Sequence, residues 1–179
     1  MVNIFTIKIL ICGSSAGCSK FIDAINELNF SVDPEPIKTM LGGVRAEDND
    51  DKSLLYIFAL VDYLSPLKIP SDMWEVFNDQ ALGVIILVDS HKDVFQDRIT
   101  EIQSLLRFII KDHRKTTVIG VEFQSDSNAL SYEHIQAVLD IPPEIPVVPC
   151  VATDKESVKR VLVALLDEVL KAMARNKEV

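Results

Sequence analysis

The chain has 179 residues and a formal net charge of −9, with 48% hydrophobic and 25% charged residues. This composition excludes a disordered chain and fits a single folded domain, residues 1–179. The 18 Lys and Arg residues are scattered along an acidic sequence, which argues against a nucleic-acid partner.

No apolar run approaches the ~18 to 20 residues that a membrane-spanning helix requires, and residues 1–10 lack the pattern of a cleaved signal. We therefore expect a cytoplasmic protein without a transmembrane segment. The cysteines Cys12, Cys18 and Cys150 contain no CxxC pair, which favours reduced thiols over a disulfide framework or a zinc site.

The first elements read as strand, loop and helix. Residues 4–12, "IFTIKILIC", are apolar and β-branched and predict a strand that ends at Gly13 in a loop of small residues. Apolar residues then recur at helical spacing, at Phe21, Ile22, Ile25 and Leu28. Together these segments predict the first half of a βαβ unit.

The next stretch, residues 31–53, carries Pro34, Pro36, a Gly pair and the acidic run "EDNDDK", which predict a connection with at most an irregular edge strand. A buried strand is expected at 53–61. A short helix is expected at 71–79, with Ser71 as its N-cap.

The second half of the chain alternates regularly between strands and helices. "ALGVIILVDS" at 81–90 is apolar on both faces, as the centre of a helix-covered parallel sheet requires, and its strand stops at Asp89. A helix follows around residues 99–109. The remaining expected elements are a strand at 116–123, a helix at 131–141, a strand at 145–152 and a long amphipathic helix at 154–174.

This alternation predicts an α/β fold with a doubly wound, mostly parallel sheet flanked by helices. Ligands of such sheets bind beyond the carboxyl ends of the strands. In this sequence those ends are the loops at 13–19, 59–69, 89–96, 122–130 and 150–154.

The loop "ICGSSAGCSK", residues 11–20, is similar to a phosphate-binding P-loop without its lysine. In the pattern GxxxxGK[ST], counting from Gly13 puts Ser19 at the lysine, and a one-residue deletion puts Cys18 there. Lys20 is expected to point away from the loop, because a helix turns ~100° per residue. A helix N-terminus without a cation holds anions weakly, so a strand-to-helix turn without a ligand is the favoured interpretation.

Three stretches carry a wider resemblance: "IKILICG" with "KFIDAI" at 7–25, "ALGVIILVDS", and residues 129–170, "ALSYEHIQAVLDIPPEIPVVPCVATDKESVKRVLVALLDEVL". With these stretches the chain resembles the Ras-like small GTPases over nearly its full length, and most closely the gliding-motility-type (MglA-like) predicted GTPases of bacteria and archaea. The resemblance implies a P-loop NTPase fold with the architecture of a Ras-like G-domain.

The resemblance also implies a nucleotide site. Asp126 would match the aspartate that accepts hydrogen bonds from the guanine ring, and Ala152 in "CVAT" would match the backbone contact of the SAK-type loop. Ser19 and Thr39 would match the hydroxyls that bind magnesium. The phosphate loop would comprise Gly13, Ser14, Ser15, Ala16, Gly17, Cys18 and Ser19.

Two family motifs are missing, however. "FALVDYLSPLKIP" at 58–70 lacks the glycine that senses the terminal phosphate, and "GVEFQSD" at 120–126 lacks the Asn and Lys of NKxD. Hydrolysis needs a phosphate-bridging cation and an oriented water, and no residue here obviously supplies either. We therefore expect a degenerate domain without GTP hydrolysis and without a cofactor, acting as a regulatory or scaffold module that binds a protein partner through residues 31–80.

Two alternatives stay open. The first is an atypical protein that binds GTP or GDP with Mg²⁺ weakly through residues 13–19 and Asp126. The second is a flavodoxin-like protein that holds flavin mononucleotide with the small polar residues of "GSSAGCS", although only Tyr63 and Phe123 offer aromatic rings nearby.

Several isolated residues have simpler interpretations than a role in chemistry. Asp89 is expected to cap the turn that follows its strand. Cys18 is expected to be a buried filler of the turn rather than a reactive thiol. The histidines His91, His113 and His134 are too far apart in the pattern for a metal cluster and are expected to be solvated. The sequence leaves the oligomeric state open.

Overall fold

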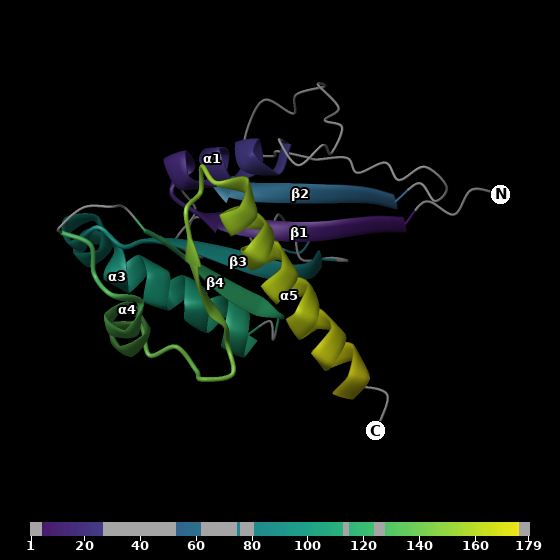
Figure 1. Cartoon of the computed structure of the whole chain (residues 1–179). Helices are drawn as coiled ribbons and strands as arrows, with labels where there is room; N and C mark the ends of the chain where they lie inside the picture. The colour runs from purple at the N-terminus through teal and green to yellow at the C-terminus, as the bar shows by residue number, and fades with distance from the viewer. Residues whose placement is uncertain are drawn as a thin grey trace.

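The structure is a computed structural model that describes residues 5–26, 53–61, 75, 81–112, 115–123 and 128–175. It is an α/β fold in which strands and helices alternate along the described chain except between β2 and β3, which follow each other in the element order (Figure 1). A π-helical turn, Phe108–Asp112, continues α3. The elements are β1 Phe5–Gly13, α1 Ser15–Asn26, β2 Ser53–Val61, β3 Ala81–Asp89, α3 Lys92–Arg107, β4 Thr117–Glu122, α4 Tyr132–Val138, β5 Val147–Cys150 and α5 Lys155–Arg175.

The sheet has five strands in the order β2-β1-β3-β4-β5, and all its neighbouring strands run parallel. In the centre of the sheet, Ile11 of β1 lies opposite Ala59 of β2 on one side and Ile85 of β3 on the other. The predicted α/β fold with a mostly parallel sheet is therefore confirmed. The strand order reverses between β1 and β3, which makes this the topological switch point of the sheet.

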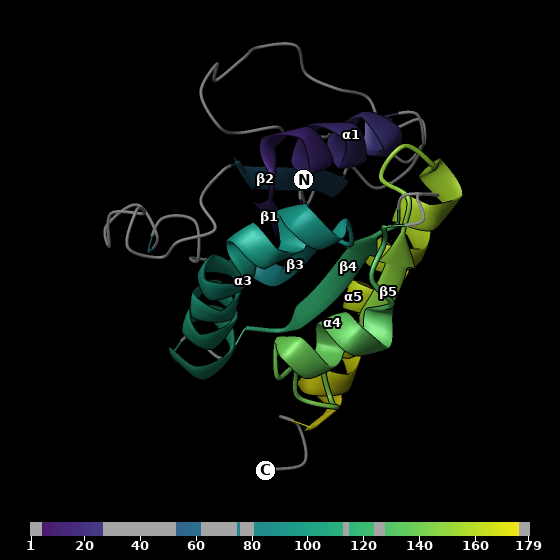
Figure 2. The same cartoon turned by 90° about the vertical axis from the view of Figure 1, so that its left-hand side faces the viewer.

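Helices cover both faces of the sheet, as Figure 2 shows for α3 and α4 in front of the strands. Because successive strand residues point to opposite faces, Ile9 and Ile11 of β1 pack with α1 and α5, while Leu10 and Cys12 pack with α3 and α4. All four side chains are buried. Burial on both faces explains why β1 and β3 are continuous apolar runs rather than alternating ones.

Two expected elements are markedly shorter than the sequence predicts. The expected helix at 131–141 begins after Ser131, whose hydroxyl accepts from the His134 N–H as an N-cap, but it ends at Val138. Asp140 there adopts a positive φ of 51°, which turns the chain out of the helix. The expected strand at 145–152 keeps only Val147–Cys150. Of the expected helix at 71–79, only Glu75 is described, and it is helical.

Helix α5 packs directly on the sheet at Gly83 of β3. A β-carbon there would stand 2.7 Å from Leu165 Cδ1 and 2.9 Å from the Thr116 carbonyl oxygen. Real β-carbons do not approach other atoms this closely, so a side chain at Gly83 would push α5 away from the sheet. The close contact between α5 and β3 therefore depends on glycine.

We expect Gly83→Ala to lower the free energy of unfolding by about 1 to 3 kcal/mol, because it overpacks a closed core. Urea unfolding followed by circular dichroism measures this loss. Gly120→Ala is the matched control, since its β-carbon would stand 3.0 Å from the movable end of Leu87 and farther from everything else. Equal losses in the two variants would contradict this account of the packing.

Candidate functional site at the carboxyl edge of the sheet

The carboxyl ends of four neighbouring strands meet at one edge of the sheet, at Gly13, Asp89, Glu122 and Cys150. The register pairs Asp89 with Glu122 and Glu122 with Cys150. This edge includes the topological switch point between β1 and β3, where sheets of this kind bind ligands. It is therefore the candidate functional site.

The turn after β1 is shorter than a phosphate-binding loop. Ser14 is the only residue between β1 and α1, and residues 15–19 already belong to the helix. The Cys18 N–H donates to the Ser14 carbonyl oxygen at 2.9 Å, and the Gly17 N–H donates to Ser14 Oγ at 3.1 Å. Ser14 thus acts as the N-cap of α1 and satisfies two amides of its first turn.

Glu122 lies against this first turn of α1. A β-carbon on Gly17 would stand 3.1 Å from Glu122 Oε2. Lys20, one helical turn farther along, places its Nζ 3.9 Å from Glu122 Oε1. The expectation that Lys20 points away from the loop is wrong, because the carboxylate at the end of β4 attracts it. The side chain of Lys20 is 48% exposed, so this ion pair stabilises the fold little.

Burial raises the pKa of the Glu122 carboxyl above its ordinary value of 4.5. Nearby Lys20 lowers the pKa of Glu122 by favouring the charged form, whereas the negative charge of Asp89 raises it further. Glu122 is 9% exposed as a whole residue. The edge of the sheet thus holds a carboxyl group in a place that disfavours its ionisation.

Hydrogen bonds fix the strand ends around Glu122. The Ser90 hydroxyl donates to the Glu122 carbonyl oxygen at 2.7 Å, and the Ser90 N–H donates to the same oxygen at 3.1 Å. The Phe123 N–H donates to the Cys150 carbonyl oxygen at 2.8 Å, and the Val151 N–H donates to Ser157 Oγ at 2.9 Å. Backbone and hydroxyl groups thus join β3, β4, β5 and the start of α5 into one rim.

The structure brings together only part of the site expected from the sequence. Residues 13–19 and the buried Ala152 lie at the edge just described, with Cys18 buried and Ser19 exposed on α1. The side chain of Ser15 is outside the described part, whereas Ala16 is exposed. Asp126 and Thr39 also lie outside the described residues. The contact of Glu122 with α1 was not predicted from the sequence. Its only signal there is an acidic residue at the end of an otherwise apolar strand.

The side chains of Asp89 and His134 occupy the places that the sequence predicts. Asp89 Oδ1 accepts from the His91 N–H at 2.8 Å and so caps the turn before α3. His134 is exposed on α4, as expected, but His91 is only partly exposed, which corrects the expectation for that residue. His113 lies outside the described residues. Within the described ranges no group of three or more His, Cys, Asp or Glu side chains is placed to hold a metal ion.

No helix in the described part of the chain is both long and apolar enough to cross a membrane. Comparison with protein-family models gave no match, and comparison with curated proteins gave no significant relative.

We expect Glu122→Gln to stabilise the protein at neutral pH. At a pH where the carboxyl is protonated in both the folded and the unfolded state, its raised pKa costs no stability. As the pH rises through the ordinary value of 4.5 and then through the pKa of the folded state, the free energy of unfolding falls. The gain from the substitution should therefore vanish at low pH and grow as the pH increases. Urea unfolding of both proteins across a pH series measures it.

Glu144→Gln, at an exposed position before β5, is the control and should show no such pH-dependent difference from the wild type. A Glu122→Gln variant that loses stability at neutral pH would contradict the assignment of an unfavourable buried charge.

The cysteines Cys12, Cys18 and Cys150 are all buried. Burial raises the pKa of the Cys12 thiol, and nearby Cys18 adds to the effect. Burial also raises the pKa of Cys150 to about 12, with the charge of Glu122 as the next contribution. Since the thiolate is the reactive form, we expect none of these thiols to react with an aromatic disulfide reagent in the folded protein.

In denaturant, all 3 thiols should react. The absorbance of the released thiolate, followed with and without guanidinium, checks this prediction. Fast reaction of any of these thiols in the native protein would contradict their burial.

Proposed function

We propose that the chain is a degenerate Ras-like domain that does not hydrolyse GTP and acts as a regulatory or scaffold module that binds a protein partner. The observation that carries the proposal is the Glu122 carboxylate against the first turn of α1. In a G-domain this turn follows the phosphate loop, and its amides and lysine face the phosphates.

A phosphate at this turn would meet a negative charge already in place. Two unit charges about 4 Å apart repel by roughly 4 kcal/mol at an effective dielectric constant near 20. The amides of Gly17 and Cys18 already donate to Ser14, so they offer a phosphate little in return. Lys20, the nearest cation on α1, is engaged by Glu122.

The position of Lys20 also gives the first alternative its best support. If Glu122 moved aside, Lys20 would be released from its ion pair. Lys20 is the one basic residue within residues 13–20. An atypical protein that binds GTP or GDP with Mg²⁺ weakly is therefore the second candidate. Its guanine and magnesium contacts would come from Asp126, Ser19 and Thr39.

The strand order β2-β1-β3-β4-β5 is also the order of flavodoxin-like folds, with flavin mononucleotide at the switch point between β1 and β3. The phosphate of that cofactor would meet the same carboxylate of Glu122. The order alone therefore does not favour a flavoprotein over the module proposed here. The proposed partner surface at 31–80 is described only in β2 and at Glu75, and its role is inferred from the resemblance.

We expect denatured, purified protein to release neither guanine nucleotide nor flavin. Titration with a fluorescent GTP analogue in excess Mg²⁺ should show no saturation up to millimolar concentration, because Glu122 repels the phosphates. Liquid chromatography of the supernatant and fluorescence anisotropy measure the two quantities. Stoichiometric GTP or GDP released from the wild type would overturn the proposal.

Two variants identify the cause. If the charge of Glu122 excludes phosphates, Glu122→Gln should bind the GTP analogue more tightly than the wild type, whereas Glu144→Gln should not. If the weak-binding alternative holds, the wild type itself should saturate in the micromolar range and Gly17→Val should abolish this. The added β-carbon would stand only 3.0 Å from Ser14 Oγ, in the turn that would hold the phosphates.

A further inference from the structure

A hollow of about 390 Å³, hereafter the α3–α4 hollow, lies between the C-terminal half of α3 and the segment that connects α4 to β5. Its volume is within the range of roughly 300 to 1,000 Å³ that small-molecule sites have. Because α3 runs back from the carboxyl edge, the hollow lies toward the opposite end of the sheet. It is therefore separate from the candidate site described above.

The floor of the α3–α4 hollow is apolar and buried. It is formed by Leu106 of α3 and by Leu139 and Ile141 of the connecting segment, which belong to one core and are 4%, 4% and 7% exposed. Ile110, in the π-helical turn that continues α3, and Pro142 add partly buried apolar surface. A floor of this kind suits the hydrocarbon part of a ligand, because covering it removes apolar surface from water.

Hydrogen bonds hold the two walls of the hollow in place. The side-chain amide of Gln103 donates from Nε2 to the Val138 carbonyl oxygen at 3.0 Å, which ties α3 to the end of α4. The Ile141 N–H donates to the Gln136 carbonyl oxygen at 3.1 Å and so fixes the connecting segment against α4. The hollow is thus formed before a ligand binds, which lowers the free energy that ordering costs on binding.

Two exposed residues of opposite charge line the hollow, one from each wall. Arg107 belongs to α3, and Asp140 belongs to the connecting segment. They form no ion pair with each other, and within the described ranges neither forms an ion pair with another residue. A ligand that lies between them can therefore place a negative group at Arg107 and a positive group at Asp140.

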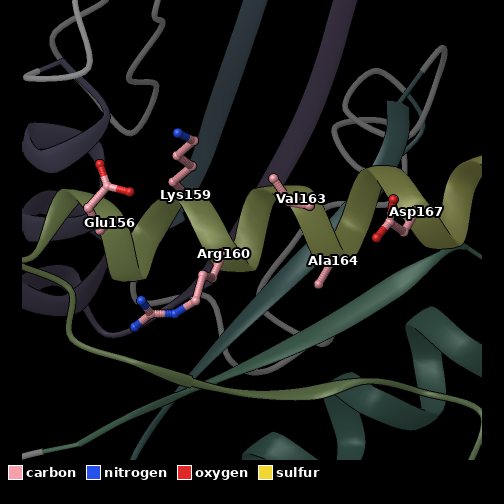
Figure 3. A pocket seen from close by; sticks show the side chains of 6 residues that line it. All are labelled: Glu156, Lys159, Arg160, Val163, Ala164 and Asp167. Atoms are coloured by element: carbon pink, nitrogen blue, oxygen red, sulfur yellow. The ribbon is translucent and has the colours of Figure 1, made fainter.

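A hollow on α5 lacks these features. Its described lining residues all belong to that one helix, and Figure 3 shows their side chains spread along its ribbon: Glu156, Lys159, Arg160, Val163, Ala164 and Asp167. None of the six is buried. A ligand that touches one exposed helix side covers little of its own surface, so the α3–α4 hollow is the better site.

We propose that the α3–α4 hollow binds a small zwitterion with an apolar body, that is, a free apolar amino acid or a short apolar peptide. Its carboxylate pairs with the Arg107 guanidinium, its ammonium group pairs with the Asp140 carboxylate, and its hydrocarbon part covers the buried floor. Exposed ion pairs contribute little free energy, so the dissociation constant lies in the millimolar range. The site uses no residue of the carboxyl edge and does not depend on the function proposed above.

Titration of the isotope-labelled full-length chain with leucine and with leucyl-leucine, followed by nuclear magnetic resonance, tests the proposal. Amide shifts should saturate and should map to residues 103–110 and 139–143. Saturation with either probe supports the proposal, and the tighter probe gives the length of the ligand. An N-acetylated probe lacks the ammonium group and an amidated probe lacks the carboxylate, so each should bind at least about threefold more weakly than the parent zwitterion.

Two variants assign the charged contacts. Arg107→Ala should remove the preference for the zwitterion over the amidated probe and keep the preference over the N-acetylated probe. Asp140→Asn should do the reverse, and asparagine tolerates the positive φ of this position. Arg160→Ala, on α5 at the opposite face of the sheet, is the control and should leave both preferences unchanged. Circular dichroism confirms that each variant is folded.

The absence of saturation with both probes would overturn the proposal, and so would saturation that maps to another part of the chain. Equal binding of the zwitterionic, N-acetylated and amidated probes would show that neither charge is recognised and would overturn the proposed class of ligand.

Discussion

Burial of the parallel sheet on both faces is the constraint on which the rest of this structure depends. Side chains of β1 and β3 enter one core with α1 and α5 and a second core with α3 and α4. A strand buried on both faces has few positions that tolerate a polar side chain, because an unpaired polar group in an apolar core costs free energy. The one charged residue of β3, Asp89, accordingly stands at the carboxyl end of that strand.

That edge is arranged to satisfy its polar groups internally. Ser14 caps α1, the Ser90 hydroxyl bonds to the Glu122 carbonyl oxygen, and Ser157 accepts from Val151. Glu122 adds a carboxylate at the positive end of the helix dipole, where an external anion would otherwise be favoured. The same place in the fold that suits a phosphate is thus occupied by a side chain of the protein, which is the physical basis of the proposed loss of nucleotide chemistry.

Helix α5 packs on the sheet along one side and is exposed to water along another. Its inner side depends on Gly83, which lets Leu165 approach the sheet, and its outer side keeps apolar residues in contact with water.

The order and type of most described elements follow from the sequence alone, because long apolar strands and the 3.6-residue period of α5 are strong local signals. The ends of the elements were less predictable. Helix α4 ends at Val138 because Asp140 takes a positive φ, and no local sequence pattern predicts this. Local pattern did predict the cap made by Asp89 and the burial of Cys18. Only the tertiary structure decided the contact of Glu122 with Gly17 and Lys20, because these residues lie about a hundred positions apart and meet through the order in which the strands pair.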